Sequence, residues 1–187
     1  MSPGNLSKNL SDITYENFVG WHLREGVYAR DSALYNHCVF GDFYGPPRFT
    51  VTTGFRYSEG DDPTNATRVQ NSVLQNVQGT ALNNLASEDY NVFYSNLSNV
   101  VNMPAGAHST NANPALQYLV RIEPGHALLK GTASDGGDKG AGIMKRIGVS
   151  GTLYGEPGYN TLTDEDLWPF PNEDVIRKHF RAYAYSG

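Results

Sequence analysis

The sequence has a single cysteine, few charged residues and no long apolar run. Cys38 cannot form a disulfide within the chain, and its place in the apolar segment 37–40 favours a small buried side chain. His37 precedes it, but neighbouring residues of a strand point to opposite faces, so we do not expect this histidine to activate the thiol. No stretch of 18 apolar residues is present, which argues against a membrane-spanning helix.

Charged residues make up 18% of the chain, and the formal net charge is −5. An acidic surface is a poor partner for a polyanionic backbone, so we do not expect nucleic acid binding. The sequence also lacks zinc-ligand spacing, a phosphate-binding glycine loop and a nucleophile-elbow motif. Residues 1–5 lack the basic and apolar parts of a signal peptide, and we expect a longer parent chain whose export signal lies upstream.

Turn-forming residues take the place of charged ones, because the chain has 20 glycines and 17 asparagines. Both residue types tolerate positive φ, and asparagine also bonds to nearby backbone groups. Between them lie four short apolar runs that each contain an asparagine. The runs cover residues 13–19, 33–40, 69–74 and 90–94. This pattern predicts short strands and many turns.

The runs recur at intervals that predict stacked coils. Phe18 and Phe40 are 22 residues apart, and the next intervals, to Leu74 and then to Phe93, are 34 and 19. The interval of 34 becomes about 22 if a loop of about 12 residues is removed, and the proline- and glycine-rich segment at about 44–66 offers that loop. A period of roughly 20–25 residues is typical of a β-solenoid, in which each coil buries its apolar face only against its neighbours.

Asparagines at equivalent turns of a solenoid can stack into a ladder of amide hydrogen bonds along the axis. We assign this structural role to Asn17, Asn36, Asn71 and Asn91. Turn asparagines are so commonly structural that a role in ligand binding is the weaker interpretation.

Five segments contain turn and strand motifs in a recognisable order. They are a Tyr-Asn-x-Phe strand in 88–96, an Ala-His-Ser turn in 106–109, an Asn-Pro turn in 111–114, a Pro-Gly turn in 122–132 and an Asp-x-Gly-Ala exit in 135–141. This order resembles the closing coils of right-handed parallel β-helix repeat proteins of the bacterial extracellular type. His126 stands where those proteins usually have serine, and His108 falls in their closing turn, where a structural role is implied. The resemblance implies an all-β fold with a right-handed parallel β-helix over residues 1–149.

Residues 150–187 form a different unit. The Leu-Trp-Pro-Phe-Pro-Asn-Glu block at 167–173 resembles a segment that follows the solenoid in some bacterial β-helix proteins. Apolar residues at helical spacing predict a short helix at about 172–183. We expect this tail to cap or flank the C-terminal end of the solenoid, where strand edges would otherwise lie unpaired.

A set of polar and aromatic residues near the N-terminus is the candidate site. β-helix polysaccharide lyases, which the fold resembles, need a base for the proton beside a uronate carboxylate, a cation that neutralises this carboxylate and rings that stack on sugars. The catalytic candidates are His22 or Tyr28 as the base and Arg24 or Arg30 as the cation. The substrate-binding candidates are Trp21 as a sugar platform, with His37, Asp42 and Arg48. The same residues also suit a solvated strand face, and both interpretations stay open.

Other chemistry has less support. Hydrolysis would need two facing carboxylates, for which Asp31 and Asp42 are the nearest pair by coil spacing. We expect no cofactor or resident metal. The sequence Gly136-Gly137-Asp138 resembles a calcium-binding glycine repeat, but it occurs once, where such sites need several stacked repeats.

Three functions remain open from the sequence. The first, which we prefer, is the C-terminal portion of a secreted or cell-surface β-helix protein that binds or presents polysaccharide. The second is part of a polysaccharide lyase or glycoside hydrolase active on acidic polysaccharide, so the sequence does not decide whether the chain is an enzyme. The third is a structural or adhesive solenoid with a protein partner, for which an exposed apolar stripe on one sheet would be the sign.

Overall fold

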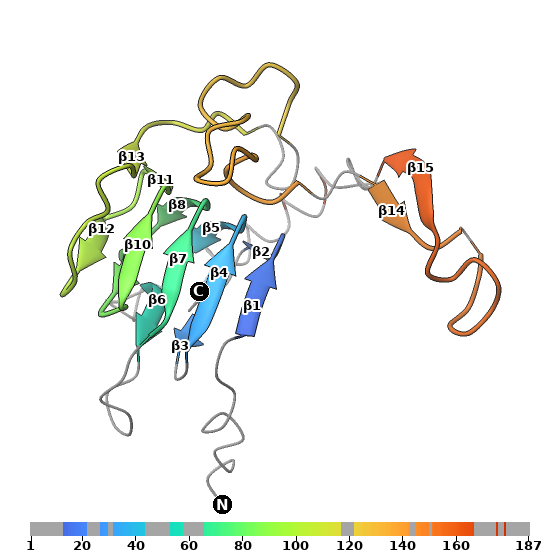
Figure 1. Cartoon of the computed structure of the whole chain (residues 1–187), viewed down its shortest axis with the longest axis horizontal. Coiled ribbons are helices and arrows are strands. Elements are labelled where there is room, and N and C mark those ends of the chain that lie inside the picture. Colours follow the sequence, from blue (N-terminus) through green and yellow to red (C-terminus); the bar gives the residue numbers. More distant parts are fainter. Residues whose placement is uncertain are drawn as a thin grey trace, which may run out of the picture.

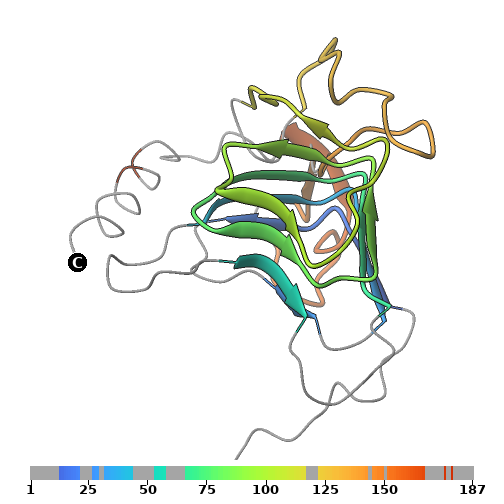
Figure 2. The same ribbon diagram turned by 90° about the vertical axis from the view of Figure 1, so that its left-hand side faces the viewer.

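The computed structural model is an all-β solenoid of about three coils, built from stacked parallel strands (Figure 1). It describes residues 13–21, 27–29, 32–43, 53–57, 66–116, 122–142, 145–149 and 151–166, together with Val175 and Lys178. The expected fold class is therefore confirmed. Three parallel sheets enclose the core, as the view in Figure 2 shows.

The three sheets run along the solenoid, and every coil contributes strands to them. Sheet A consists of β1 (Ile13–Glu16), β4 (Ala33–Asn36), β7 (Arg68–Gln70) and β10 (Ser87–Asp89). Sheet B consists of β2 (Val19–Trp21), β5 (Val39–Phe43), β8 (Val73–Val77), β11 (Val92–Tyr94) and β13 (Thr110–Asn111). Sheet C consists of β3 (Val27–Ala29), β6 (Thr53–Tyr57), β9 (Thr80–Asn83) and β12 (Ser98–Val101).

The strand register follows the spacing of the apolar residues. Phe40 stands opposite Leu74, and Leu74 opposite Phe93, at the intervals of 34 and 19 residues. Gly20, not Phe18, stands opposite Phe40, because Phe18 lies in the corner before β2, where its ring contacts that of Phe40 at 5.7 Å. Strand β6 lies inside the segment 44–66, which was expected to be a single loop. The additional residues of this longer coil therefore lie on both sides of a strand.

The coils turn at corners where single residues adopt a left-handed backbone. The first corner, between sheets A and B, has Asn17, His37, Asn71 and Tyr90 at φ between 50° and 57°. At the second corner the residues with similar φ values are Asp42, Asn76 and Ser95. At the third corner they are Asn84 and Asn102. Asparagine and aspartate tolerate this region better than other residues with a Cβ, which suits the five asparagines found at these corners.

The asparagines bond between coils, but not as one ladder. Asn71 donates to the Oδ1 atom of Asn36 at 2.9 Å, although Asn36 lies at the end of β4 and stands opposite Gln70. At the second corner, Asn76 donates to Asp42 at 2.8 Å. Asn91 instead bonds to backbone groups of the preceding coil. The amides thus stabilise corners through several local patterns.

Inward-facing side chains fill the space between the sheets. The main cluster contains Tyr35, Cys38, Phe40, Phe43, Val69, Leu74, Val77, Ala81, Leu82, Leu85 and Phe93. Tyr15 stacks on Tyr35 with ring centroids 4.8 Å apart, continuing the column toward β1. Complete burial of a side chain of this size contributes roughly 1.5–3 kcal/mol, so this column is the main source of stability.

A covering segment, residues 122–142, lies on the outer face of sheet B. Ile122, Leu129 and Ala141 pack against a row of valines that point outward from three successive coils. The row consists of Val39, Val73 and Val92. This part of the chain was expected to form closing coils, but it contains turns and no strand, and it buries the outer face instead.

The covering segment forms hydrogen bonds with the first-corner residue of each of three successive coils. The amide of Gly142 donates to Asn17 Oδ1 at 3.2 Å, and the amide of Ser134 donates to Asn71 Oδ1 at 2.8 Å. His37, between them, bonds to the carbonyl of Asp138. Three consecutive corner residues therefore hold one strip of chain in place.

The chain continues into an antiparallel hairpin of β14 (Lys145–Ile147) and β15 (Leu162–Asp166). In Figure 1 this hairpin stands beyond the β1 end of the solenoid, and not over the β12–β13 end that the tail was expected to cap. Val175 and Lys178, the two described residues of the expected helix, are helical. None of the described segments forms a helix with the length and apolarity that crossing a membrane requires.

Candidate functional site

Most of the predicted site residues cannot be placed by their side chains. His22, Arg24, Arg30 and Arg48 lie outside the described residues. Trp21 and Tyr28 are described by their backbone alone, and they belong to β2 of sheet B and β3 of sheet C. Their assigned roles stay predictions.

His37 holds the covering segment. Its Nδ1 atom is 2.6 Å from the carbonyl oxygen of Asp138, and its Nε2 atom is 2.8 Å from Oδ2 of Asp135. A carbonyl and a carboxylate can only accept, so the imidazolium, which donates from both nitrogens, satisfies both contacts. A backbone bond from Gly137 and the bond from His37 hold the pKa of Asp135 below its ordinary value. The geometry gives His37 a structural task at the first corner.

Asp42 lies at the second corner with only 1% of its surface exposed. Its Oδ1 atom accepts from Asn76 of the next coil. Its partner in the hydrolysis hypothesis, Asp31, lies outside the described residues. A carboxylate this deeply buried does not face a groove that a saccharide could enter.

Cys38 is fully buried, and we expect it to be unreactive in the folded protein. Burial raises the pKa of its thiol to about 11, so only about one thiol in a thousand is ionised at pH 8. Iodoacetamide at pH 8 should label the urea-unfolded protein within minutes and leave the native protein unlabelled, as measured by mass spectrometry. Equal labelling rates in the two states would contradict the structural assignment.

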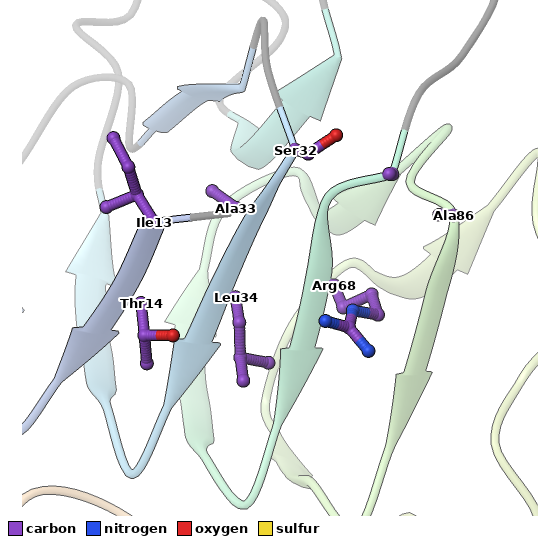
Figure 3. Close-up of a pocket in the computed structure, with 8 residues that line it drawn as sticks. Ile13, Thr14, Ser32, Ala33, Leu34, Arg68 and Ala86 are labelled. Carbon is purple, nitrogen blue, oxygen red and sulfur yellow. The ribbon is translucent and has the colours of Figure 1, made fainter. Parts of the chain in front are cut away.

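A hollow of about 420 Å³ lies at the start of the sheet A strands. It is lined by Ile13, Thr14, Ser32, Ala33, Leu34, Ala66, Arg68 and Ala86. Thr14, Leu34 and Arg68 stand opposite one another on β1, β4 and β7 and project to the same side (Figure 3). Parallel strands place them about 4.8 Å apart, so the hollow offers a hydroxyl, an apolar surface and a cation in one row.

Arg68 is the charged group of this hollow. Its side chain is exposed, and no carboxylate within the described part of the chain forms an ion pair with it. The planar guanidinium presents paired N–H donors that match a carboxylate. The hollow is therefore suited to an anionic group beside an apolar or hydroxyl-bearing surface.

A second group of side chains, which we call the corner cluster, comprises Asp89, Tyr90, His108 and Lys139. The Oδ2 atom of Asp89 is 2.9 Å from Nδ1 of His108, and its Oδ1 atom accepts from the backbone amides of Tyr90 and His108. The rings of Tyr90 and His108 stack with centroids 4.4 Å apart. Asp89 thus fixes the orientation of His108 and leaves its Nε2 atom directed away from this bond.

Lys139 completes the corner cluster from the covering segment. Its side chain is 5% exposed, and Nζ lies 5.5 Å from the centre of the Tyr90 ring. Desolvation lowers the pKa of this amine, and the charge of Asp89 acts in the opposite direction. No hydrogen bond or ion pair of Nζ is present within the described residues, so this buried side chain has no directly bonded anion.

The sequence did not point to either group. Arg68 lies 54 residues from Thr14, and Lys139 lies 49 residues from Tyr90, so only the register of the coils brings them together. The sequence Asp89-Tyr90-Asn91 contained a partial sign of the corner cluster. An aspartate before a turn often accepts hydrogen bonds from the backbone amides that follow it.

Metal binding has no support in the described part of the chain, where no three His, Cys, Asp or Glu side chains are grouped to hold an ion. Asp138, from the turn that resembles a calcium-binding glycine repeat, accepts from Lys130 at 2.6 Å and from the amide of Gly131. The fold places the protein among β-solenoids. No family model, no curated protein and no solved structure matches the chain.

Proposed function

We propose that this protein binds an acidic polysaccharide on the outer face of sheet A, as a non-catalytic part of a secreted or cell-surface protein. The observation that carries this proposal is the hollow around Arg68, where an exposed guanidinium with no acidic partner among the described residues lies beside Leu34 and Thr14. A uronate offers the matching groups, namely a carboxylate, hydroxyls and an apolar ring face.

The repeated structure of the sheet supports a repeated ligand. Outward residues of successive coils recur about every 4.8 Å, and a polysaccharide presents its groups at regular intervals too. The net charge of −5 opposes a polyanion at long range, but salt screens this repulsion beyond about 8 Å at physiological ionic strength. Affinity then depends on local contacts such as that of Arg68.

The adhesive alternative has less support on the solenoid itself. Several large apolar side chains are exposed on the hairpin region, including Ile147, Leu153, Tyr154 and Leu162. They do not form a stripe along a solenoid sheet, which is the feature that an adhesive solenoid would need.

Replacing Arg68 with methionine should weaken uronate binding about tenfold, because a charge-assisted hydrogen bond is lost while the side-chain stem is kept. Isothermal titration with galacturonate and hexagalacturonate measures this effect. Arg68→Lys should give a smaller loss, since the charge remains and the paired donors do not.

Arg146→Met is the matched control. It removes the same charge from the exposed hairpin, where Arg146 is 3.5 Å from Glu165, and it should leave binding unchanged. If wild-type protein binds neither ligand, or if both methionine variants bind as wild type does, the proposed function is wrong.

A further inference from the structure

We propose that the corner cluster binds a second carboxylate of the same acidic saccharide chain, through Lys139 and the Nε2 atom of His108. This inference rests on the proposed function and adds a second anchoring point and a pH response to it. Neither residue belongs to the hollow around Arg68.

Lys139 supplies a cation that the fold has already made rigid. Its amide donates to the carbonyl of Leu129, and the amide of the next residue, Gly140, donates to the carbonyl of Asn71, both at 2.8 Å. The stem is buried while the ammonium has no bonded anion within the described residues. A buried charge is stabilised when an opposite charge joins it, so a ligand carboxylate has a favourable place here.

His108 supplies the second contact. Because the carboxylate of Asp89 accepts from Nδ1, the neutral ring has a lone pair at Nε2 and the protonated ring has an N–H there. The side chain is 56% exposed, so a ligand can reach it. Only the protonated ring donates from Nε2 to a carboxylate, and binding should therefore be stronger at pH 5.5 than at pH 8.

The charged and titratable groups around His108 agree with this direction. Asp89 contacts Nδ1, Tyr90 stacks on the ring, and Lys139 lies across Tyr90. Glu88 faces the same segment, but its carboxylate accepts from Gly106, Ser109 and Asn91 and points into the core. The two acidic groups are thus occupied by the protein, whereas Nε2 of His108 and Nζ of Lys139 have no acidic partner among the described residues.

The two anchoring points lie within reach of one oligosaccharide. Arg68 stands opposite Ser87 of β10, and the corner residue Tyr90 lies three positions further along the chain. His108 stacks on Tyr90 one coil beyond. Strand spacing and rise place the backbones of Arg68 and His108 roughly 14 Å apart. A hexasaccharide can span this separation, whereas a monosaccharide cannot.

The test compares galacturonate with hexagalacturonate on the full chain at pH 5.5 and pH 8. Lys139→Met keeps the buried stem and removes the charge. His108→Asn keeps a donor for Asp89 and removes Nε2. Each variant should bind galacturonate as wild type does and should bind hexagalacturonate about fivefold to tenfold more weakly at pH 5.5.

The pH response separates a binding role from a structural one. Wild type should bind the hexamer more tightly at pH 5.5 than at pH 8, and His108→Asn should show little difference. Unfolding midpoints in urea check that both variants fold. If both bind the hexamer as wild type does while Arg68→Met remains weak, the corner inference is wrong and the proposed function stands. If wild-type protein binds neither saccharide, both are wrong.

Discussion

Replacing Glu88 with alanine is expected to lower the free energy of unfolding by about 4 kcal/mol. Glu88 is 4% exposed and stands in the inward row of sheet A, opposite Val69 of the neighbouring coil. Its carboxylate accepts from the amide of Gly106, from the hydroxyl of Ser109 at 2.6 Å and from Asn91 at 2.9 Å. Alanine would leave these buried donors without an acceptor. The total free energy of unfolding of a domain is only about 5–15 kcal/mol, so this loss is a large part of it.

Two further variants separate the charge from the shape. Glu88→Gln keeps the side-chain volume but turns an amide NH2 group toward a donor. It should lower the free energy of unfolding by about 2 kcal/mol. Glu16→Gln, on exposed β1 of the same sheet, should change stability by less than about 0.5 kcal/mol. Urea unfolding followed by circular dichroism measures all three. Equal midpoints for Glu88→Ala and Glu16→Gln would show that the carboxylate does not hold the last coil.

The repeat itself was predictable from the sequence because an inward position recurs in every coil, whatever loops lie between. Phe40, Leu74 and Phe93 occupy one such position, and their spacing gave the correct register across the long coil. The spacing placed Phe18 at the same inward position as Phe40, but Phe18 lies at a corner. Its ring still contacts that of Phe40, as the ring of an inward residue would. Spacing alone does not distinguish the two positions.

The covering segment was not predicted, although the strands beneath it contained a sign of it. Sheet B has adjacent apolar pairs, namely Val39-Phe40, Val73-Leu74 and Val92-Phe93. Because neighbouring residues of a strand face opposite sides, such pairs indicate a sheet that is buried on both faces. What the sequence does not indicate is which segment covers the valines, since residues 122–142 have short apolar runs that also suit a strand.

The candidate site was less predictable than the fold for the same reason. Arg68, His108 and Lys139 come from β7, from the segment before β13 and from the covering segment. Their proximity depends on the register of coils with unequal lengths and on how the cover lies. The composition around Trp21–Arg48 drew attention to a richer set of polar residues, but polar residues are common on any outward strand face.

Replacing Gly140 with alanine is expected to destabilise the packed position of the covering segment by about 3 kcal/mol and so to detach it. Gly140 has φ +92°, and a Cβ there would lie 3.1 Å from Cγ2 of both Val39 and Val73. The substitution therefore adds backbone strain and overpacking at the centre of the valine row. Gly136 has φ +82° with open space around it, so Gly136→Ala should show the backbone strain alone, about 1 kcal/mol.

Trypsin cleavage after Lys130 and Lys139 measures detachment directly, because Lys139 is protected by burial in the folded protein. Gly140→Ala should be cut at these sites much faster than Gly136→Ala, while the amides of Phe40 and Leu74 stay protected from hydrogen exchange. The same variant should also lose the tighter binding of hexagalacturonate, because Lys139 is held in place by its neighbour Gly140. If cleavage and hexamer binding in Gly140→Ala match those in Gly136→Ala, close packing at the valine row does not hold the cover.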